Sequence, residues 1–161
     1  MFRSAEFAQK ALDMLALTDD IQRTLTVIGY SGKALWLLVD HIIWFGRTKI
    51  YDVDTKKWGQ RSAWCWLIAL LSLTLNDLRK IQLLTRRAED MKLAGTINSA
   101  QGAELRRELR KAYLQLVINL SDVWIPLSVL QYVSKGVGAM GGVIASLTAI
   151  HVVWNKNVHG K

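Results

Sequence analysis

The sequence predicts an all-α, multi-helix membrane protein with amphipathic helices and a C-terminal transmembrane helix. Apolar residues make up 51% of the 161 residues, and the chain has seven Trp and a single Pro. These apolar residues are gathered in blocks, and their spacing within most blocks is that of helices. By length, residues 1–161 are expected to form one domain.

The first helix is expected over residues 4–28, and a second over 33–46. Apolar positions in the first recur at steps of four and three, which gives one amphipathic stripe. The sequence "GYSG" at 29–32 is expected to end it. The second helix is apolar on almost every face. At about 21 Å it is too short to cross a hydrocarbon core of about 30 Å, so it must pack on other helices or lie in the interface.

Two longer helices are expected in the middle of the chain. The first covers residues 62–93, and its first fifteen residues, 62–76, carry no formal charge. That length suits either a partial span or a buried helix. The second, residues 103–125, has a leucine-rich stripe with basic residues on its other side. Pro126 is expected to stop it.

Residues 136–154 give the strongest membrane signal. They hold no Asp, Glu, Lys or Arg over nineteen residues, which is about 28 Å of helix and close to the hydrocarbon thickness. Small residues recur every four positions on one face, and such a face lets two helices approach closely. We expect this face to make helix–helix contacts in the membrane and to dimerise the chain: Gly138, Gly142 and Ser146.

The charge distribution favours an anionic membrane surface as the partner. The net charge is +8, and residues 79–111 contain nine Lys or Arg against four acidic residues. Nucleic acid is the other usual partner of a basic chain, but no nucleic-acid-binding motif accompanies these charges. Basic segments beside apolar ones suit anionic lipids. The side chains expected to contact lipid headgroups are Arg106, Arg107, Arg110 and Lys111.

No arrangement of residues predicts an enzyme. Asp40 and His41 are neighbours, so on a helix they point about 100° apart and cannot face one substrate together. The chain has three His and one Cys, too few and too scattered for a metal site. We therefore expect no catalytic, metal-binding or cofactor-binding residues and no cofactor. Asp40 is expected to pair with a basic side chain such as Arg47 or Arg61.

Four blocks of the sequence form a recognisable set. The first is "KALWLLVDHIIWFGR", and the second is "KKWGQRSAWCWLIALLSLTLNDLRKI". The third is "VINLSDVWIPL", and the fourth is the glycine-rich segment 136–154. Read together, these blocks resemble the peroxisomal membrane protein 11 (peroxin-11) family, and they occur in the family's order over roughly residues 10–154. The motif positions are Asp40, Trp44, Gly46, Arg47, Trp58, Arg61, Ser62, Asp77, Asn119, Asp122, Ile125, Pro126 and Leu127.

This resemblance implies an integral protein of the peroxisomal membrane. It would be a non-enzymatic protein that shapes and elongates peroxisomes and promotes their fission, which regulates their number and size. The implied partners are membrane lipids, further copies of this chain or of other family members, the import receptor peroxin-19, a tail-anchored fission adaptor and a dynamin-related GTPase.

One feature departs from the family pattern. The family has further helical sequence before the 4–28 helix, so its N-terminal region is expected to be missing here. Two other functions remain open on the residues alone. One is a pore for small metabolites, lined by polar residues such as Asp77 and Asn119. The other is a soluble helical adaptor.

Overall fold

The structure, a computed structural model, describes residues 2–13 and 19–159. Within these ranges every regular element is a helix, which confirms the all-α class. The helices are α1 (Phe2–Asp13), α2 (Asp20–Arg47), α3 (Thr55–Leu93), α4 (Ala100–Asp122), α5 (Trp124–Val129) and α6 (Lys135–His159).

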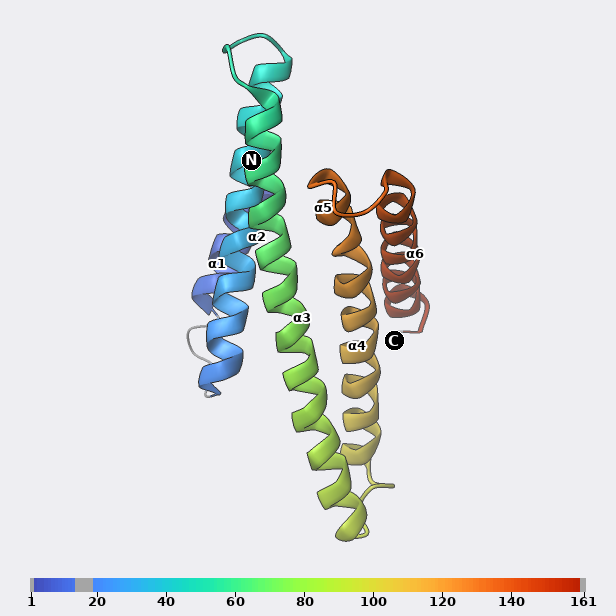
Figure 1. The fold of residues 1–161 in the computed structure, drawn as a ribbon. Helices are drawn as coiled ribbons and strands as arrows, with labels where there is room; N and C mark the ends of the chain where they lie inside the picture. Colours follow the sequence, from blue (N-terminus) through green and yellow to red (C-terminus); the bar gives the residue numbers. More distant parts are fainter. Residues whose placement is uncertain (1, 14–18, 160–161) are drawn as a thin grey trace.

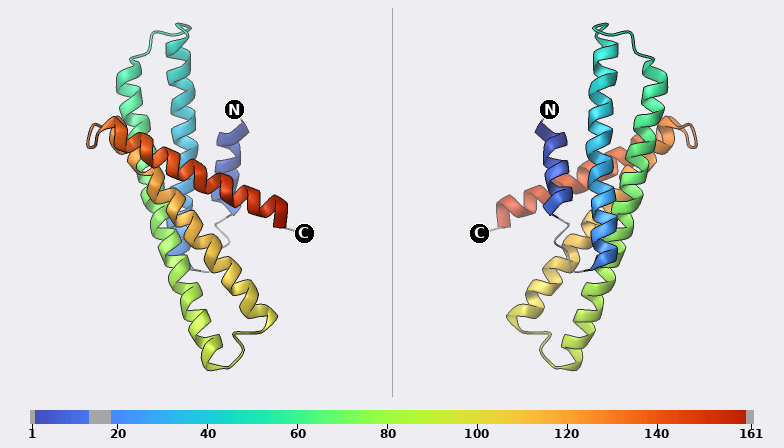
Figure 2. Two further views of the ribbon diagram at one scale, coloured as in Figure 1. Left: turned by 90° about the vertical axis from the view of Figure 1, so that its right-hand side faces the viewer. Right: turned by 90° about the vertical axis from the view of Figure 1, so that its left-hand side faces the viewer.

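Helix α3 is the centre of the fold (Figure 1). Its 39 residues make a rod of about 58 Å. Helix α2 packs antiparallel to the N-terminal part of α3, and α4 packs along its C-terminal part. Helix α1 packs on α2. Helix α6 returns along α4 and α5, and its axis diverges from that of α4 away from α5 (Figure 2).

The apolar core is small, and one cluster of it lies along the α3–α4 contact. Ile81 and Leu84 of α3 are buried there against Leu105 and Ala112 of α4. Leu70, further up α3, is among the most deeply buried side chains. Because so few large side chains are buried, most of the apolar residues lie on the outside of the helices.

The predicted helix 4–28 is divided between α1 and α2. Residues 14–18, which include the predicted stripe positions Met14 and Thr18, lie outside the described residues. Helix α2 begins after Asp19, whose Oδ1 accepts hydrogen bonds from the backbone N–H groups of Ile21 (3.0 Å) and Gln22 (3.2 Å). An Asp in this position satisfies N–H groups that have no partner in the helix, so it starts a new helix.

The prediction that "GYSG" ends a helix is wrong, because α2 runs through residues 29–32 without a break. Both glycines allow a close approach to α3. A Cβ on Gly29 would lie 2.5 Å from Leu73 Cγ, and one on Gly32 would lie 2.9 Å from Ala69 Cβ. These positions are glycine because a side chain would push the two helices apart. The predicted helices 4–28 and 33–46 therefore meet in a single α2.

The other boundaries shift by smaller amounts. Helix α3 starts at Thr55 rather than 62, because Asp54 accepts a hydrogen bond from the backbone N–H of Lys57 (3.1 Å) and caps it. Helix α4 starts at Ala100 rather than 103 and ends at Asp122 rather than 125. Pro126 lies in the first turn of α5, where a missing N–H costs nothing. Helix α6 contains the whole predicted segment 136–154.

Candidate functional site

Two segments of the described chain are long and apolar enough to cross a membrane. They are Ala100–Val129, which joins α4 to α5, and Lys135–Asn155 in α6. Only 17% of the apolar window of either segment is buried, so neither is the core helix of a soluble bundle. Helix α3 is not one of these segments, although its residues 62–76 carry no charge.

Large apolar side chains are exposed on five helices, and we call this surface the apolar belt. Two contacts show which parts of the helices lie at the same height along the bundle. Asn119 of α4 lies beside Asp77 of α3, and Tyr132, after α5, lies against Trp64 of α3. Exposed apolar area of this extent marks a surface that meets lipid or a partner. The belt consists of Leu35, Leu38 and Trp44 of α2, Trp64, Ile68, Leu71, Leu75 and Leu78 of α3, Val117 and Leu120 of α4, Trp124 of α5, and Met140, Val143, Ile144, Leu147, Ile150, Val153 and Trp154 of α6.

Basic side chains lie beyond the belt at both ends of the bundle. At the α2–α3 loop, the exposed basic residues are Arg47, Lys49, Lys56, Lys57 and Arg61. At the end of the α3–α4 hairpin they are Arg86, Arg87, Lys92, Arg106, Arg107, Arg110 and Lys111. An apolar zone between two basic zones has the layout of a protein that meets anionic headgroups on either side of a hydrocarbon layer.

The four predicted headgroup residues lie on α4 and are all exposed. Arg106 also has a structural contact, because its Nη1 donates a hydrogen bond to the carbonyl of Ile97 (2.8 Å) in the preceding loop. Arg107, Arg110 and Lys111 form no ion pair within the described residues. Three of the four cations are therefore available to a headgroup.

A polar cluster is buried where α2, α3 and α4 come together. Asn119 Nδ2 donates a hydrogen bond of 2.6 Å to Asp77 Oδ2, and both side chains are buried. Lys33 of α2 interacts electrostatically with Asp122 and Asp77. The structure thus brings together three of the motif residues from distant parts of the chain. Lys33 is a member that the sequence analysis missed, since its only signal is one cation at the start of an apolar run.

Other motif residues have packing roles. A Cβ on Gly46 would lie 2.8 Å from Val53 Cβ, so this glycine lets the α2–α3 loop fold back on α2. Ser62 and Pro126 are buried. The guanidinium of Arg61 lies over the ring of Trp58, 5.2 Å from its centre.

Three motif residues of α2, Asp40, Trp44 and Arg47, are exposed. Asp40 forms no ion pair with Arg47, Arg61 or any other described residue, so its predicted pairing is wrong. Arg61 lies over Trp58 instead.

The predicted helix-contact residues of α6 lie against the same chain. A Cβ on Gly138 would be 2.5 Å from Ser128 Cβ, and one on Gly142 would be 3.3 Å from Ile125 Cδ1. Gly141, which the sequence analysis did not single out, is packed against α4, where a Cβ would be 2.5 Å from the carbonyl of Ser121. Ser146 is exposed. Contact between two copies through Gly138 would require α5 to move away.

Asp19 ties the start of α2 to α3. Its Oδ2 lies 3.2 Å from Nη2 of Arg79, and both side chains are partly buried. The hydrogen bond from the backbone N–H of Gln22, helped by that of Ile21 and by the Arg79 guanidinium, holds the pKa of Asp19 below its usual value. This carboxylate is the main ionic link between the two helices at their lower end.

The sequence matches a known protein family over most of its length. The family model described as Peroxisomal biogenesis factor 11 matches residues 1–154. The chain belongs to the peroxisomal biogenesis factor 11 family. It is a membrane protein of the peroxisome, as the four sequence blocks predict, and the apolar belt is the surface that membrane integration requires.

Named relatives agree with this assignment. The chain is 30% identical to the peroxisomal membrane protein PMP27 of Saccharomyces cerevisiae, over 91% of this chain and 68% of that protein. It is 26% identical to peroxisomal membrane protein 11B of Bos taurus, over 91% of this chain and 71% of that protein. The match to peroxisomal membrane protein 11A of Arabidopsis thaliana is 31% identical and covers 50% of this chain and 35% of that protein. No solved structure matches the chain.

Proposed function

We propose that this family member is a non-enzymatic protein that shapes and elongates the peroxisomal membrane and promotes fission of the organelle. The observation that carries the proposal is the apolar belt, which lies between two basic ends of one helical bundle. Burial of such a belt in hydrocarbon, with cations at headgroup level, anchors the protein and displaces lipid around it.

The angle between α6 and α4 supports a shaping role. Both helices contain candidate spans, but the axis of α6 diverges from that of α4 (Figure 2). At least one of them must therefore be tilted in the bilayer. Tilted apolar helices that spread apart occupy more area in the plane of the membrane, at a given depth in the bilayer, than a bundle of parallel spans does. If more of that area lies in one leaflet, the leaflet expands and curvature is favoured.

The partners in this proposal follow from family membership. Peroxin-19 would deliver the chain to the membrane, and copies of this chain or of other family members would associate there. A tail-anchored fission adaptor and a dynamin-related GTPase would complete division.

The test is reconstitution of the purified chain into liposomes that contain anionic lipid, followed by electron microscopy. We expect elongated or tubular vesicles. The charge-reversed triple variant R107E/R110E/K111E should insert but leave the vesicles round, because the cations no longer meet the headgroups. Round vesicles with the natural chain inserted at the same density would contradict the proposal.

A pore for small metabolites is the second candidate, and the buried polar cluster favours it. Asp77 and Asn119 lie inside the bundle at the level of the apolar belt, and Thr74 Oγ1 and Asn76 Oδ1 nearby on α3 are buried without a hydrogen-bond partner. Polar groups in such a position can line a solute path. Single-channel recordings in planar bilayers separate the two candidates, since tubulation without conductance supports shaping alone. A conductance that D77N alters would support the pore.

A further inference from the structure

Two adjoining hollows lie beside the lower part of α3, near the end of the α3–α4 hairpin. Their volumes are about 430 Å³ and about 470 Å³. They share Arg87, Asp90 and Glu108, so they form one continuous hollow, which we call the hairpin groove. Leu84 and Leu105 contribute apolar surface, and Asp19 and Gln22 of α2 close one end. The charged residues that α3 and α4 contribute are Lys80, Arg86, Arg87, Asp90, Glu104 and Glu108.

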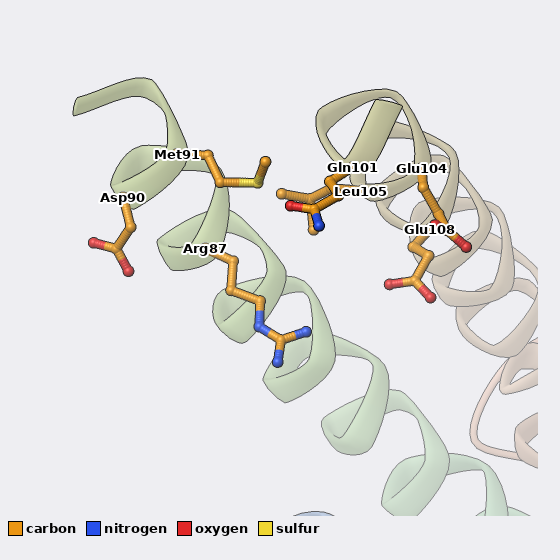
Figure 3. Close-up of a pocket in the computed structure, with 7 residues that line it drawn as sticks. All are labelled: Arg87, Asp90, Met91, Gln101, Glu104, Leu105 and Glu108. Carbon is orange, nitrogen blue, oxygen red and sulfur yellow. The ribbon is translucent and has the colours of Figure 1, made fainter. Parts of the chain in front are cut away.

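The opposite charges of the hairpin groove do not meet. Arg87 reaches from α3 toward the hollow, and Glu104 and Glu108 line it from α4 (Figure 3). None of the three, nor Lys80, Arg86 or Asp90, forms an ion pair with a described residue. Of the acidic residues that line the groove, Asp19 alone is paired, with Arg79. The groove therefore offers cations and carboxylates, separated by open space, to one ligand that carries both signs.

The position of the groove points to lipid. On α3 its residues begin at Lys80, shortly after the last belt residue, Leu78. On α4 its residues lie about one to three helical turns before Ala112, where the apolar part of the candidate span begins. A ligand in the groove would therefore be at headgroup depth, with the belt available to its acyl chains.

We propose that the hairpin groove binds a zwitterionic phospholipid whose headgroup ends in a primary ammonium, the chemistry of phosphatidylethanolamine. Arg87, with Arg86 and Lys80, holds the phosphate through charge-assisted hydrogen bonds. Glu108, with Glu104 beside it on α4, accepts hydrogen bonds from the ammonium. The inference rests on the membrane location of the chain and is independent of the proposed shaping activity.

The same carboxylates reject the other common headgroups. A choline headgroup has no N–H to donate, so it leaves the carboxylates of Glu104 and Glu108 without a hydrogen bond. An anionic glycerol headgroup has no cation for them at all and brings a net negative charge into their field. The groove volume is in the range of pockets that enclose a small polar ligand.

The test is lipid retention by the natural chain. The protein is reconstituted in nanodiscs with equal amounts of phosphatidylethanolamine, phosphatidylcholine and phosphatidylglycerol, and the lipids it retains on transfer to detergent are counted by native mass spectrometry. We expect phosphatidylethanolamine to be retained about tenfold over either competitor, the ratio expected from one charge-assisted hydrogen bond. Equal retention of the three lipids would overturn the inference.

A matched pair of variants locates the site. In E104Q/E108Q the cations of the groove remain without their acidic counterparts, so retention should switch from phosphatidylethanolamine to phosphatidylglycerol. The control E6Q/E89Q makes the same change in net charge at exposed positions outside the groove and should keep the natural preference. All four side chains are exposed, so both variants should fold. An identical shift in both pairs would mean that net charge alone decides retention, and the site would be wrong.

Discussion

The two glycine-lined helix contacts of this protein have different surroundings. In the α2–α3 contact, Gly29 and Gly32 lie against Leu73 and Ala69. In the contact of α6 with α4 and α5, Gly138 lies against Ser128, and Gly141 lies against the carbonyl of Ser121. In both, the absence of a side chain lets two backbones approach closely.

What differs is the set of interactions beside the glycines. Along α2 and α3, Trp36 stacks on Trp66 with ring centres 4.5 Å apart, and Asp19 pairs with Arg79. The α6 contact has no described ion pair or ring stack, and most side chains exposed on α6 from Met140 to Trp154 are large and apolar, the polar exceptions being Ser146 and His151. Directional contacts hold α2 and α3 together in water or in lipid, whereas α6 needs lipid to cover its outer face. The comparison separates the α2–α3 contact, which is the scaffold of the bundle, from the α6 contact, whose outer face depends on lipid.

The strongest way to break the scaffold is Gly29→Leu. The side chain would enter space that Leu73 already fills, so we expect a loss of about 3 kcal/mol in the free energy of unfolding, the upper part of the usual range for overpacking. Chemical unfolding in detergent, followed by circular dichroism, measures it. Gly59→Leu is the matched control, because nothing lies within 4 Å of its Cβ position. A similar loss in both variants would mean that Gly29 is not a packing position.

The α6 contact can be broken separately by Gly138→Leu. Ile125→Cys and Gly142→Cys, in a Cys65→Ser background, should form a disulfide within one chain, because Ile125 Cγ1 lies 3.7 Å from the Cβ position of Gly142. Gly138→Leu should abolish this disulfide. Gly136→Leu should not, because the Cβ position of Gly136 has only Ser134 Oγ nearby, at 3.9 Å. Disulfides between copies instead of within one chain, seen on non-reducing gels, would restore the dimer interpretation of this face.

A smaller loss is expected from the buried polar cluster. Asp77→Ala leaves the Asn119 amide buried without an acceptor, which costs about 1–3 kcal/mol of unfolding free energy. Asp77→Asn keeps an acceptor oxygen and should cost less. Equal losses for the two variants, measured by the same unfolding experiment, would show that the hydrogen bond to Asn119 contributes little.

The smallest expected effect is a loss of stability at acidic pH. The pKa of Asp19 is held below its ordinary value of 3.8 in the folded chain, mainly by the Gln22 backbone N–H. Its contribution to stability is therefore fully present above pH 3.8 and is lost as the pH falls through the lower, folded-state value. The melting temperature should drop in this acid range, and Asp19→Asn should flatten that part of the profile. An unchanged profile in the variant would exclude Asp19 as the source.

Much of the fold is local and could be read from the sequence. The membrane helix follows from the length of a charge-free run, and the helical class follows from apolar spacing; both depend only on neighbouring residues. The role of Gly29 could not be predicted in this way. Glycine suits a turn and a close helix contact equally well, and the choice depends on Leu73, which lies far along the chain.

In the candidate site, too, local features were predictable and contacts between distant residues were not. The basic residues of α4 were predictable, because their exposure follows from one helix period. The meeting of Asp77 with Asn119 joins positions 42 residues apart, and the motif resemblance named both without indicating that they touch. Lys33 and the hairpin groove depend on how three helices pack, which no local pattern encodes.

The most direct test is to measure whether the outer face of α6 meets lipid or water. Spin labels on single cysteines at Met140, Leu147 and Trp154, in a Cys65→Ser chain reconstituted in liposomes, report access to a lipid-soluble or a water-soluble relaxation agent. If α6 is a membrane helix, all three labels should respond to the lipid-soluble agent and be shielded from the aqueous one, while labels at Glu89 and Arg110 should respond in the opposite way. Aqueous access at Met140, Leu147 and Trp154 would show that this face does not meet lipid, and the membrane role of α6 would be contradicted.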